Sequence, residues 1–154
     1  MDKAKVYFIS KLEPTSLVKL YEIIGKELPG KVAVKLHSGE KGNQNYLKPE
    51  FVKDIIEHVN GTVVECNTAY EGARNTTEKH QKLLEEHNWT KYFNVDILDS
   101  EEEITLENPN GKIIQKNYVG AKMKDYDSLL VLSHFKGHPM GGFGGALKNI
   151  SIGL

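Results

Sequence analysis

An alternation between short β-rich runs and helix-like segments is the feature of this sequence that most constrains its fold. The runs at residues 32–36, 62–66 and 95–99 are rich in valine, isoleucine and leucine, and segments with helical spacing of apolar residues separate them. Two strands joined by a helix run in the same direction, because the helix returns the chain to the end at which the first strand began. The pattern therefore predicts an α/β fold with three layers, in which helices flank a mainly parallel sheet.

Further segments complete the predicted architecture. Residues 6–9 form a β-rich run before the first helix, and residues 129–132 (Leu-Leu-Val-Leu) form the most apolar run of the chain. An Asn-Pro-Asn-Gly turn within residues 103–116 predicts a β-hairpin inserted at the edge of the sheet. The helices are expected at residues 17–28, 51–59, 75–87 and 144–150. Since no repeat or linker interrupts the pattern, we expect residues 1–154 to form a single α/β domain.

Composition limits the partners of this chain. Its 20 basic and 21 acidic residues give a net charge of −1, which does not support electrostatic attraction to nucleic acid. No apolar run approaches the ~20 residues needed to span a bilayer, and the N-terminus shows no secretory leader. A single cysteine excludes an internal disulfide bond. We therefore expect a cytoplasmic protein that binds neither nucleic acid nor membranes.

Polar residues follow several of the predicted strands. The carboxyl ends of parallel strands share one edge of a sheet, which is where α/β proteins bind their ligands. The residues expected to contact a ligand through their side chains are Lys35, Ser38, Glu40, Asn67, Lys136 and Lys148. For Lys35 two interpretations remain open, because this lysine either reaches an anionic ligand or extends from a partly exposed strand into solvent.

Imidazole and thiol side chains suggest a second kind of chemistry at the same edge. His37, Cys66, His134 and His138 are residue types that bind zinc, nickel or ferrous iron, so they are candidate ligands of a divalent metal. Cys66, paired with His37 or His134, is also a candidate catalytic pair, since a thiolate beside an imidazole can act as a nucleophile. The alternative is an inert buried cysteine, with histidines that only form hydrogen bonds within loops. The sequence contains no compact zinc-binding motif, and the alternatives remain open.

A glycine-rich loop follows the last predicted strand. Gly141, Gly142, Gly144 and Gly145 precede a predicted helix, an arrangement whose free backbone N–H groups can bind a phosphate. The loop does not match the glycine patterns of nucleoside triphosphate-binding or dinucleotide-binding proteins. We expect it to approach a ligand closely, and the alternative is a flexible or tightly turning loop.

Three segments show a resemblance to a known family. They are residues 35–40 (Lys-Leu-His-Ser-Gly-Glu), 64–70 (Val-Glu-Cys-Asn-Thr-Ala-Tyr) and 133–149, which includes Gly-Gly-Phe-Gly-Gly-Ala-Leu-Lys-Asn. Over essentially its whole length the chain resembles the domain of unknown function 362 family, whose members are often labelled iron–sulfur cluster or 4Fe–4S ferredoxin-type proteins. The motif residues of the family correspond here to His37, Glu40, Cys66, Asn67, His134, Lys136, His138 and Lys148, and they mark a site without assigning roles.

The resemblance implies a cytoplasmic prokaryotic protein, frequently with a C-terminal ferredoxin-like module that contains Cys-x-x-Cys-x-x-Cys motifs. This chain has no such motif and one cysteine, whereas an iron–sulfur cluster usually takes four thiolates. We therefore expect no iron–sulfur cluster in this chain, which resembles the N-terminal part of a longer family architecture.

Two functions are compatible with these observations. In the first, the chain is a redox-associated domain whose histidines transfer protons or bind a metal, and whose lysines hold a small anionic ligand. In the second, it is a non-catalytic scaffold that docks a missing ferredoxin-like module or another redox partner, or forms a homo-oligomer through its C-terminal segment. The second rests on the apolar residues Phe143, Ile150, Ile152 and Leu154, which have no obvious later partners in the sequence. Whether the protein is an enzyme stays open.

Overall fold

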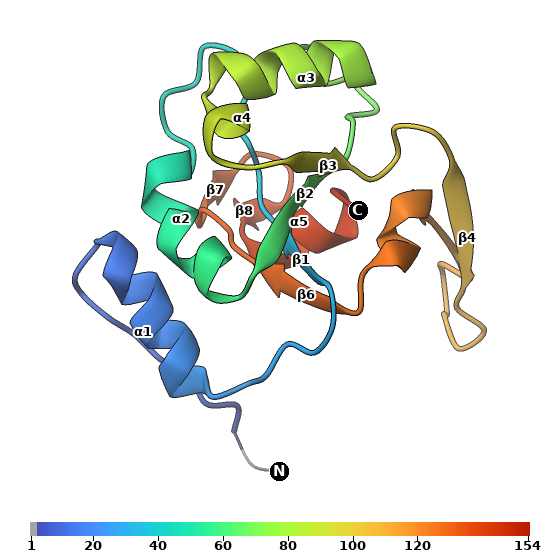
Figure 1. Cartoon of the computed structure of the whole chain (residues 1–154). Coiled ribbons are helices and arrows are strands. Elements are labelled where there is room, and N and C mark those ends of the chain that lie inside the picture. Colours follow the sequence, from blue (N-terminus) through green and yellow to red (C-terminus); the bar gives the residue numbers. More distant parts are fainter. Residues whose placement is uncertain (1–2) are drawn as a thin grey trace.

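A four-stranded parallel sheet forms the centre of the computed structural model, which describes residues 3–154 (Figure 1). The strands are β1 (Val32–Lys35), β2 (Gly61–Glu65), β3 (Val95–Ile97) and β6 (Ser128–Val131). Their order across the sheet is β3-β2-β1-β6, and every neighbouring pair is parallel. The predicted α/β fold with a mainly parallel sheet is confirmed.

Alternate residues of β1 point to opposite faces of the sheet, and each face has its own core. Val34 belongs to a large apolar cluster together with Val63 of β2, whereas Ala33 belongs to a smaller cluster together with Val64. The helices that contribute to the large cluster are α1 (Pro14–Ile24), α2 (Pro49–His58), α3 (Thr77–Glu86) and α4 (Trp89–Tyr92). On the other face, the 3-10 helix η1 (Ala121–Asp125) and Leu154 pack against the smaller cluster. The sheet therefore lies between two covering layers.

Local sequence signals explain where the helices begin and end. The side chain of Thr76 caps α3, because its hydroxyl accepts a hydrogen bond from the backbone N–H of Lys79. Helix α1 ends at Gly25, which adopts a left-handed φ of 60° and donates its N–H to the carbonyl of Tyr21. The expected helix over residues 17–28 is therefore too long at its C-terminal end, because Gly25 stops it before Pro29.

The segment at residues 6–9, which the sequence analysis interprets as the first strand, is not a strand. It has no regular secondary structure, and the side chains of Val6 and Phe8 are 89% and 88% exposed. A β-rich sequence forms a strand only where a neighbouring strand satisfies its backbone groups, and no strand of the described chain pairs with this segment. The sheet consequently begins with β1.

The predicted hairpin insertion is present, with a longer loop than expected. Strands β4 (Glu103–Glu107) and β5 (Lys116–Gly120) pair antiparallel, and residues 108–115 connect them, a longer stretch than the predicted Asn-Pro-Asn-Gly turn at residues 108–111. Asn108 extends the turn by donating its side-chain amide to the carbonyl of Ile114 over 3.1 Å.

The glycine-rich segment near the C-terminus forms a second hairpin that the sequence analysis does not predict. Strands β7 (Lys136–His138) and β8 (Gly142–Gly144) pair antiparallel and lead into helix α5 (Ala146–Ser151). Gly142 has a left-handed φ of 72°, which favours glycine at this position. Among residues 3–154, no helix combines the length and the apolar character needed to cross a membrane.

Candidate functional site

A cavity of about 710 Å³ opens at the edge of the sheet where the strands end. Each of the four strands contributes a residue that follows it: His37 after β1, Cys66 after β2, Asp99 after β3 and Ser133 after β6. The expectation that these strand ends meet is therefore correct. The β7–β8 hairpin and α5 supply another wall of the cavity.

Most of the predicted site residues line this one cavity. From the first two strand ends these are Lys35, His37, Glu40, Cys66 and Asn67. From the C-terminal segment they are His134, Lys136, His138, Gly144, Gly145 and Lys148. Ser38, Gly141 and Gly142 do not line it.

The base of the cavity is a buried ion pair between Lys35 and Glu65. The ammonium of Lys35 donates hydrogen bonds to the carboxylate of Glu65 (2.8 Å), to the carbonyl of Leu36 (2.7 Å) and to the side-chain oxygen of Asn149 (2.9 Å). Burial raises the pKa of Glu65, but Lys35 and Arg74 lower it more strongly, so the pKa of this carboxyl is about 2. The interpretation of Lys35 as a lysine on a partly exposed strand is wrong, because its side chain is 1% exposed and its three N–H groups are paired.

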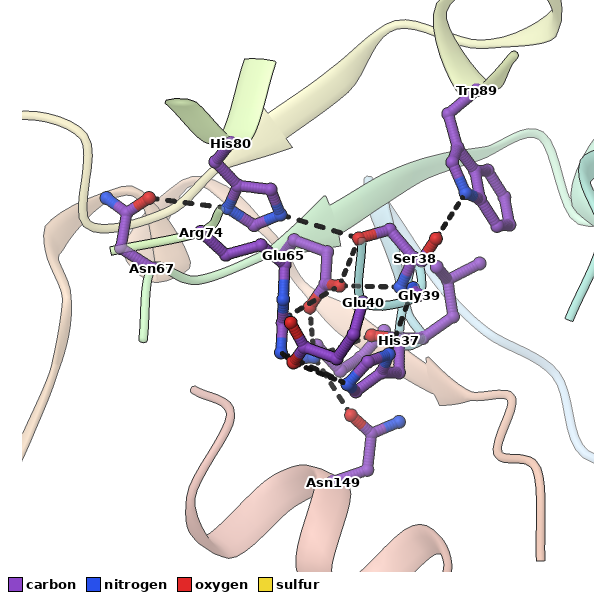
Figure 2. A network of polar contacts seen from close by, with 12 residues as sticks. His37, Ser38, Gly39, Glu40, Glu65, Asn67, Arg74, His80, Trp89 and Asn149 are labelled. Atoms are coloured by element: carbon purple, nitrogen blue, oxygen red, sulfur yellow. Dashed lines mark hydrogen bonds and ion pairs between the residues drawn. The ribbon is translucent and has the colours of Figure 1, made fainter. Parts of the chain in front are cut away.

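Ser38 is a buried structural residue that links this ion pair to helix α3. Its backbone N–H and its hydroxyl both donate to the second carboxylate oxygen of Glu65, over 2.7 and 2.8 Å. His80 of α3 lies with Nε2 3.4 Å from the Ser38 hydroxyl and with Nδ1 3.3 Å from the side-chain oxygen of Asn67 (Figure 2). Ser38 is fully buried and does not line the cavity, and its contacts position Glu65.

His80 is one of two important residues that sequence reasoning missed. Its side chain is buried, and this burial lowers its pKa to about 4. A histidine between lysine and glutamine on an amphipathic helix is typical of a solvated surface, so the sequence predicts a solvated helix face at residues 79–82, which is wrong for His80. Its position in the apolar spacing of α3, three residues before Leu83 and four before Leu84, was the available signal.

Arg74 is the second missed residue, and it joins two carboxylates. One of its terminal amino groups donates to Glu40 and lies 3.3 Å from the hydroxyl of Tyr70, while the other lies 3.6 Å from the carboxylate of Glu65. Hydrogen bonding to His37 holds the pKa of Glu40 well below its usual range; burial opposes this shift, and Arg74 and Tyr70 reinforce it. Arg74 itself is 4% exposed, and its Nε atom has no partner among the described residues.

Loop contacts engage Nδ1 of two cavity histidines. Nδ1 of His37 accepts the backbone N–H of Gly39 over 3.0 Å. Nδ1 of His138 accepts the backbone N–H groups of Met140 (3.3 Å) and Gly141 (3.1 Å). A neutral imidazole whose Nδ1 accepts has its hydrogen on Nε2, so the ring of His138 presents an N–H donor at that atom. Nε2 of His37 does not present a donor to the cavity, because it lies 3.1 Å from a terminal amino group of Arg74, which can only donate. Gly141 therefore supports His138 and does not itself face the cavity.

Alternation along residues 134–138, of which the last three form β7, gives the second hairpin two different faces. His134, Lys136 and His138 are two residues apart and all line the cavity. Phe135 lies between them on the outer face, with its ring centroid 5.6 Å from that of Phe143 on β8. The cationic face of the hairpin therefore points into the cavity and the aromatic face points away from it.

Two lysines meet over Gly144 on the cavity face. A Cβ atom at Gly144 would lie 3.7 Å from the side chain of Lys136 and 3.9 Å from that of Lys148, so the aliphatic stems of both lysines pass close to this glycine. Neither ammonium forms an ion pair with a carboxylate anywhere in residues 3–154. This wall of the cavity therefore has two positive charges that the protein does not neutralise by contact.

Cys66 lies at the cavity but is poorly suited to react as a thiolate. Burial, together with the charge of Asp99, raises the pKa of its thiol to about 12. Within residues 3–154 the thiol forms no hydrogen bond with His37 or His134, and no three His, Cys, Asp or Glu side chains are grouped closely enough to hold a metal ion. One buried thiol also does not fit an iron–sulfur cluster. The metal and nucleophile hypotheses stay predictions without a preformed side-chain arrangement.

The fold and the cavity define an α/β domain with a polar pocket at the carboxyl edge of a parallel sheet. Residues 32–154, from β1 to the last residue of the chain, match the model of a protein family described as Domain of unknown function (DUF362). The chain belongs to this family. No curated protein and no solved structure gives a significant match.

Proposed function

We propose that this domain binds a small anionic molecule in the cavity, with Lys136 and Lys148 as the residues that hold its anionic group. The observation that supports this proposal is the convergence of the two lysines over Gly144 without a carboxylate partner. An ammonium group with no acidic neighbour at a concave surface attracts an anion from solution, and a charge-assisted hydrogen bond then holds it.

The other cations of the cavity are already occupied by protein groups. Lys35 is paired with Glu65, and Arg74 is paired with Glu40. They organise the cavity and leave its two remaining lysines as the binding charges. The chemistry that this arrangement supports is recognition of an anion beside the imidazole N–H donor of His138, which fits either a binding protein or an enzyme that positions an anionic substrate.

The tautomers favour an anion over a divalent metal. A histidine that binds a metal through Nε2 donates its Nδ1–H to a second group, whereas Nδ1 of His37 and of His138 accepts backbone N–H groups. Metal binding at Nε2 would require these loop contacts to break. Calorimetry with Zn²⁺, Ni²⁺ and Fe²⁺ tests this point, and tight binding that is lost in His134→Ala/His138→Ala would favour the metal hypothesis.

Titration calorimetry with phosphate, sulfate and malonate tests the anion proposal directly. Lys136→Met and Lys148→Met keep most of the side-chain volume and remove the charge, so each should weaken binding at least tenfold, on the order of the loss of one charge-assisted hydrogen bond. Lys19→Met is the matched control, since Lys19 is exposed on α1 and does not line the cavity. Equal affinity in all four proteins, or no binding of any anion, would contradict the proposal.

Self-association through the C-terminal segment is the second candidate, and one observation favours it. Outside the cavity, this segment exposes several large apolar side chains: Phe135, Met140, Phe143 and Leu147. A ferredoxin-like partner docked on this surface would then carry the iron–sulfur cluster that the resemblance implies. Light scattering over a range of concentrations distinguishes this candidate, because a dimer that dissociates in Phe135→Ser would support it and a strict monomer would contradict it.

A further inference from the structure

We propose that the anionic group bound in the cavity is the phosphoryl group of a small soluble phosphate monoester, held by Lys136, Lys148 and the Nε2–H of His138. This inference rests on the proposed function and names the class of ligand. It follows from the number of unpaired charges, the kind of donor and the space at Gly144.

The charge of the site matches a dianion. Two lysines without an acidic partner face the cavity, and a phosphate monoester near neutral pH has a charge of about −1.5 to −2 and three strong acceptor oxygens. A carboxylate has a single charge and is best matched by the planar fork of an arginine. The arginine of this cavity, Arg74, already holds Glu40, so the free donors are the point charges of lysines.

His138 adds a donor that does not depend on its own protonation. Its Nδ1 is engaged by the backbone N–H groups of Met140 and Gly141, so the neutral ring offers Nε2–H. His138 and Lys136 are two residues apart on β7 and line the same cavity. Two ammonium groups and one imidazole N–H suit an acceptor with three oxygens.

Gly144 lies between the two lysine side chains and has no side chain of its own that would fill this space. It lies on β8 directly opposite Lys136, and a methyl group at its Cα would make ordinary contacts with both lysine stems at 3.7 to 3.9 Å. The backbone can therefore accept alanine without a clash, but the added methyl group would occupy the space between the stems. This geometry makes alanine a steric probe for a ligand at that position.

The ligand class is tested with defined probes by titration calorimetry at constant ionic strength. Glycerol 3-phosphate and inorganic phosphate should bind at least tenfold more tightly than acetate or malonate. Malonate that binds more tightly than both phosphates, in a manner that depends on the lysines, would overturn the phosphoryl assignment and leave the proposed function standing. No binding of any anion would overturn both.

A separate experiment distinguishes a soluble phosphate monoester from the phosphate headgroup of a lipid. Vesicles of phosphatidylcholine with about 10% phosphatidic acid present the same phosphoryl group on a membrane surface. Sedimentation with these vesicles combined with no affinity for glycerol 3-phosphate would overturn the assignment to a soluble ligand. Binding of glycerol 3-phosphate without sedimentation supports it.

Two substitutions of His138 separate the proposed donor from its structural role. His138→Asn keeps an acceptor near the position of Nδ1 and removes the Nε2–H, whereas His138→Gln places an amide N–H near the position of Nε2. Affinity for glycerol 3-phosphate should fall about tenfold in the asparagine variant and stay within about threefold of wild type in the glutamine variant. Equal affinity of wild type and His138→Asn would overturn the assignment of His138. If a variant fails to fold, the ¹⁵N shifts of His138 in the wild type decide, because the ligand should perturb Nε2 and leave Nδ1 an acceptor.

Gly144→Ala completes the test. Its thermal midpoint should stay close to that of wild type while its affinity for glycerol 3-phosphate falls at least tenfold. Gly137→Ala is the matched control, since a Cβ at Gly137 meets nothing within 4 Å and Gly137 does not line the cavity. Unchanged affinity in a folded Gly144→Ala variant would overturn the placement of the phosphoryl group.

Discussion

The ammonium of Lys35 lies 2.8 Å from the carboxylate of Glu65, and both side chains are almost fully buried beneath the cavity. Removing one member of such a pair leaves an uncompensated charge in the protein interior. Lys35→Met should therefore lower the free energy of unfolding by about 3–5 kcal/mol, as measured by urea denaturation. The matched control is Lys116→Met, which removes an exposed ion pair with Glu107 and should cost less than about 1 kcal/mol. Similar costs for both variants would contradict the assigned role of the buried pair.

Acid should destabilise the protein first through His80. Burial lowers the pKa of His80 from 6.5 to about 4, so between these two values the unfolded chain binds a proton that the folded chain does not. Stability therefore falls as the pH is lowered through this window. Urea denaturation of wild type and His80→Gln between pH 6.5 and 4.5 measures the effect, and the variant should show a smaller loss over this interval. His58→Gln, at an exposed position on α2, is the control and should retain the wild-type slope.

Glu65 should extend the acid sensitivity to lower pH. Its folded pKa of about 2 lies below its ordinary value of 4.5, mainly because Lys35 and Arg74 outweigh the effect of burial. The stabilisation is fully present above about pH 4.5 and is lost as the pH falls towards 2. Carboxyl ¹³C chemical shifts provide the measurement, and a Glu65 resonance that titrates at its ordinary value in the folded protein would contradict this prediction.

The close approach of the β4–β5 hairpin to the sheet can be tested at Gly120. A Cβ atom at this position would lie 2.4 Å from the carbonyl carbon of Leu98 and 2.6 Å from the backbone nitrogen of Asp99. Gly120→Ala should therefore cost about 1–3 kcal/mol, as expected for overpacking. Gly72→Ala is the control, since a Cβ there meets nothing within 4 Å, and its effect should remain within about 0.5 kcal/mol. Equal stability of the two variants would indicate that the hairpin moves freely relative to β3.

The N-cap of α3 can be tested by mutation, because this helix positions His80. The hydroxyl of Thr76 accepts the N–H of Lys79, and Thr76→Ala removes this acceptor from the first turn. The variant should lose about 1 kcal/mol of stability in thermal or urea unfolding. Thr76→Ser keeps the hydroxyl and should retain most of the stability. A loss in the serine variant as large as that in the alanine variant would show that packing of the methyl group, and not the cap, is responsible.

Local patterns were sufficient for the central strands and helices. Residues 32–36, 62–66 and 95–99 are short apolar runs between amphipathic segments, and all three become neighbouring parallel strands. The convergence of residues that follow these strands was also predictable, because parallel strands end at one edge. The alternation of His134, Lys136 and His138 with Phe135 is also visible in the sequence. The glycines that follow it are typical of a loop, however, so the sequence predicts no strand there.

Contacts between distant segments could not be predicted in the same way. Arg74 and His80 lie after β2 in the chain, and they acquire their roles only because β1 and β2 pair and bring Glu40 and Ser38 beside them. The tautomer of His138 depends on a turn of the hairpin that the glycine content alone does not specify. These features depend on long-range geometry for which a single sequence contains no periodic signal.

The amino-acid sequence by itself determined the α/β class, the parallel strands and the edge at which polar residues gather, because each depends on the period of apolar residues along the chain. Only the tertiary structure decided three features of residues 3–154: residues 6–9 pair with no strand there, Lys35 is neutralised by Glu65, and Lys136 and Lys148 meet without an acidic partner from that part of the chain. Pairing, burial and neutralisation depend on which groups lie within a few ångströms of one another, and that distance is a property of the folded chain.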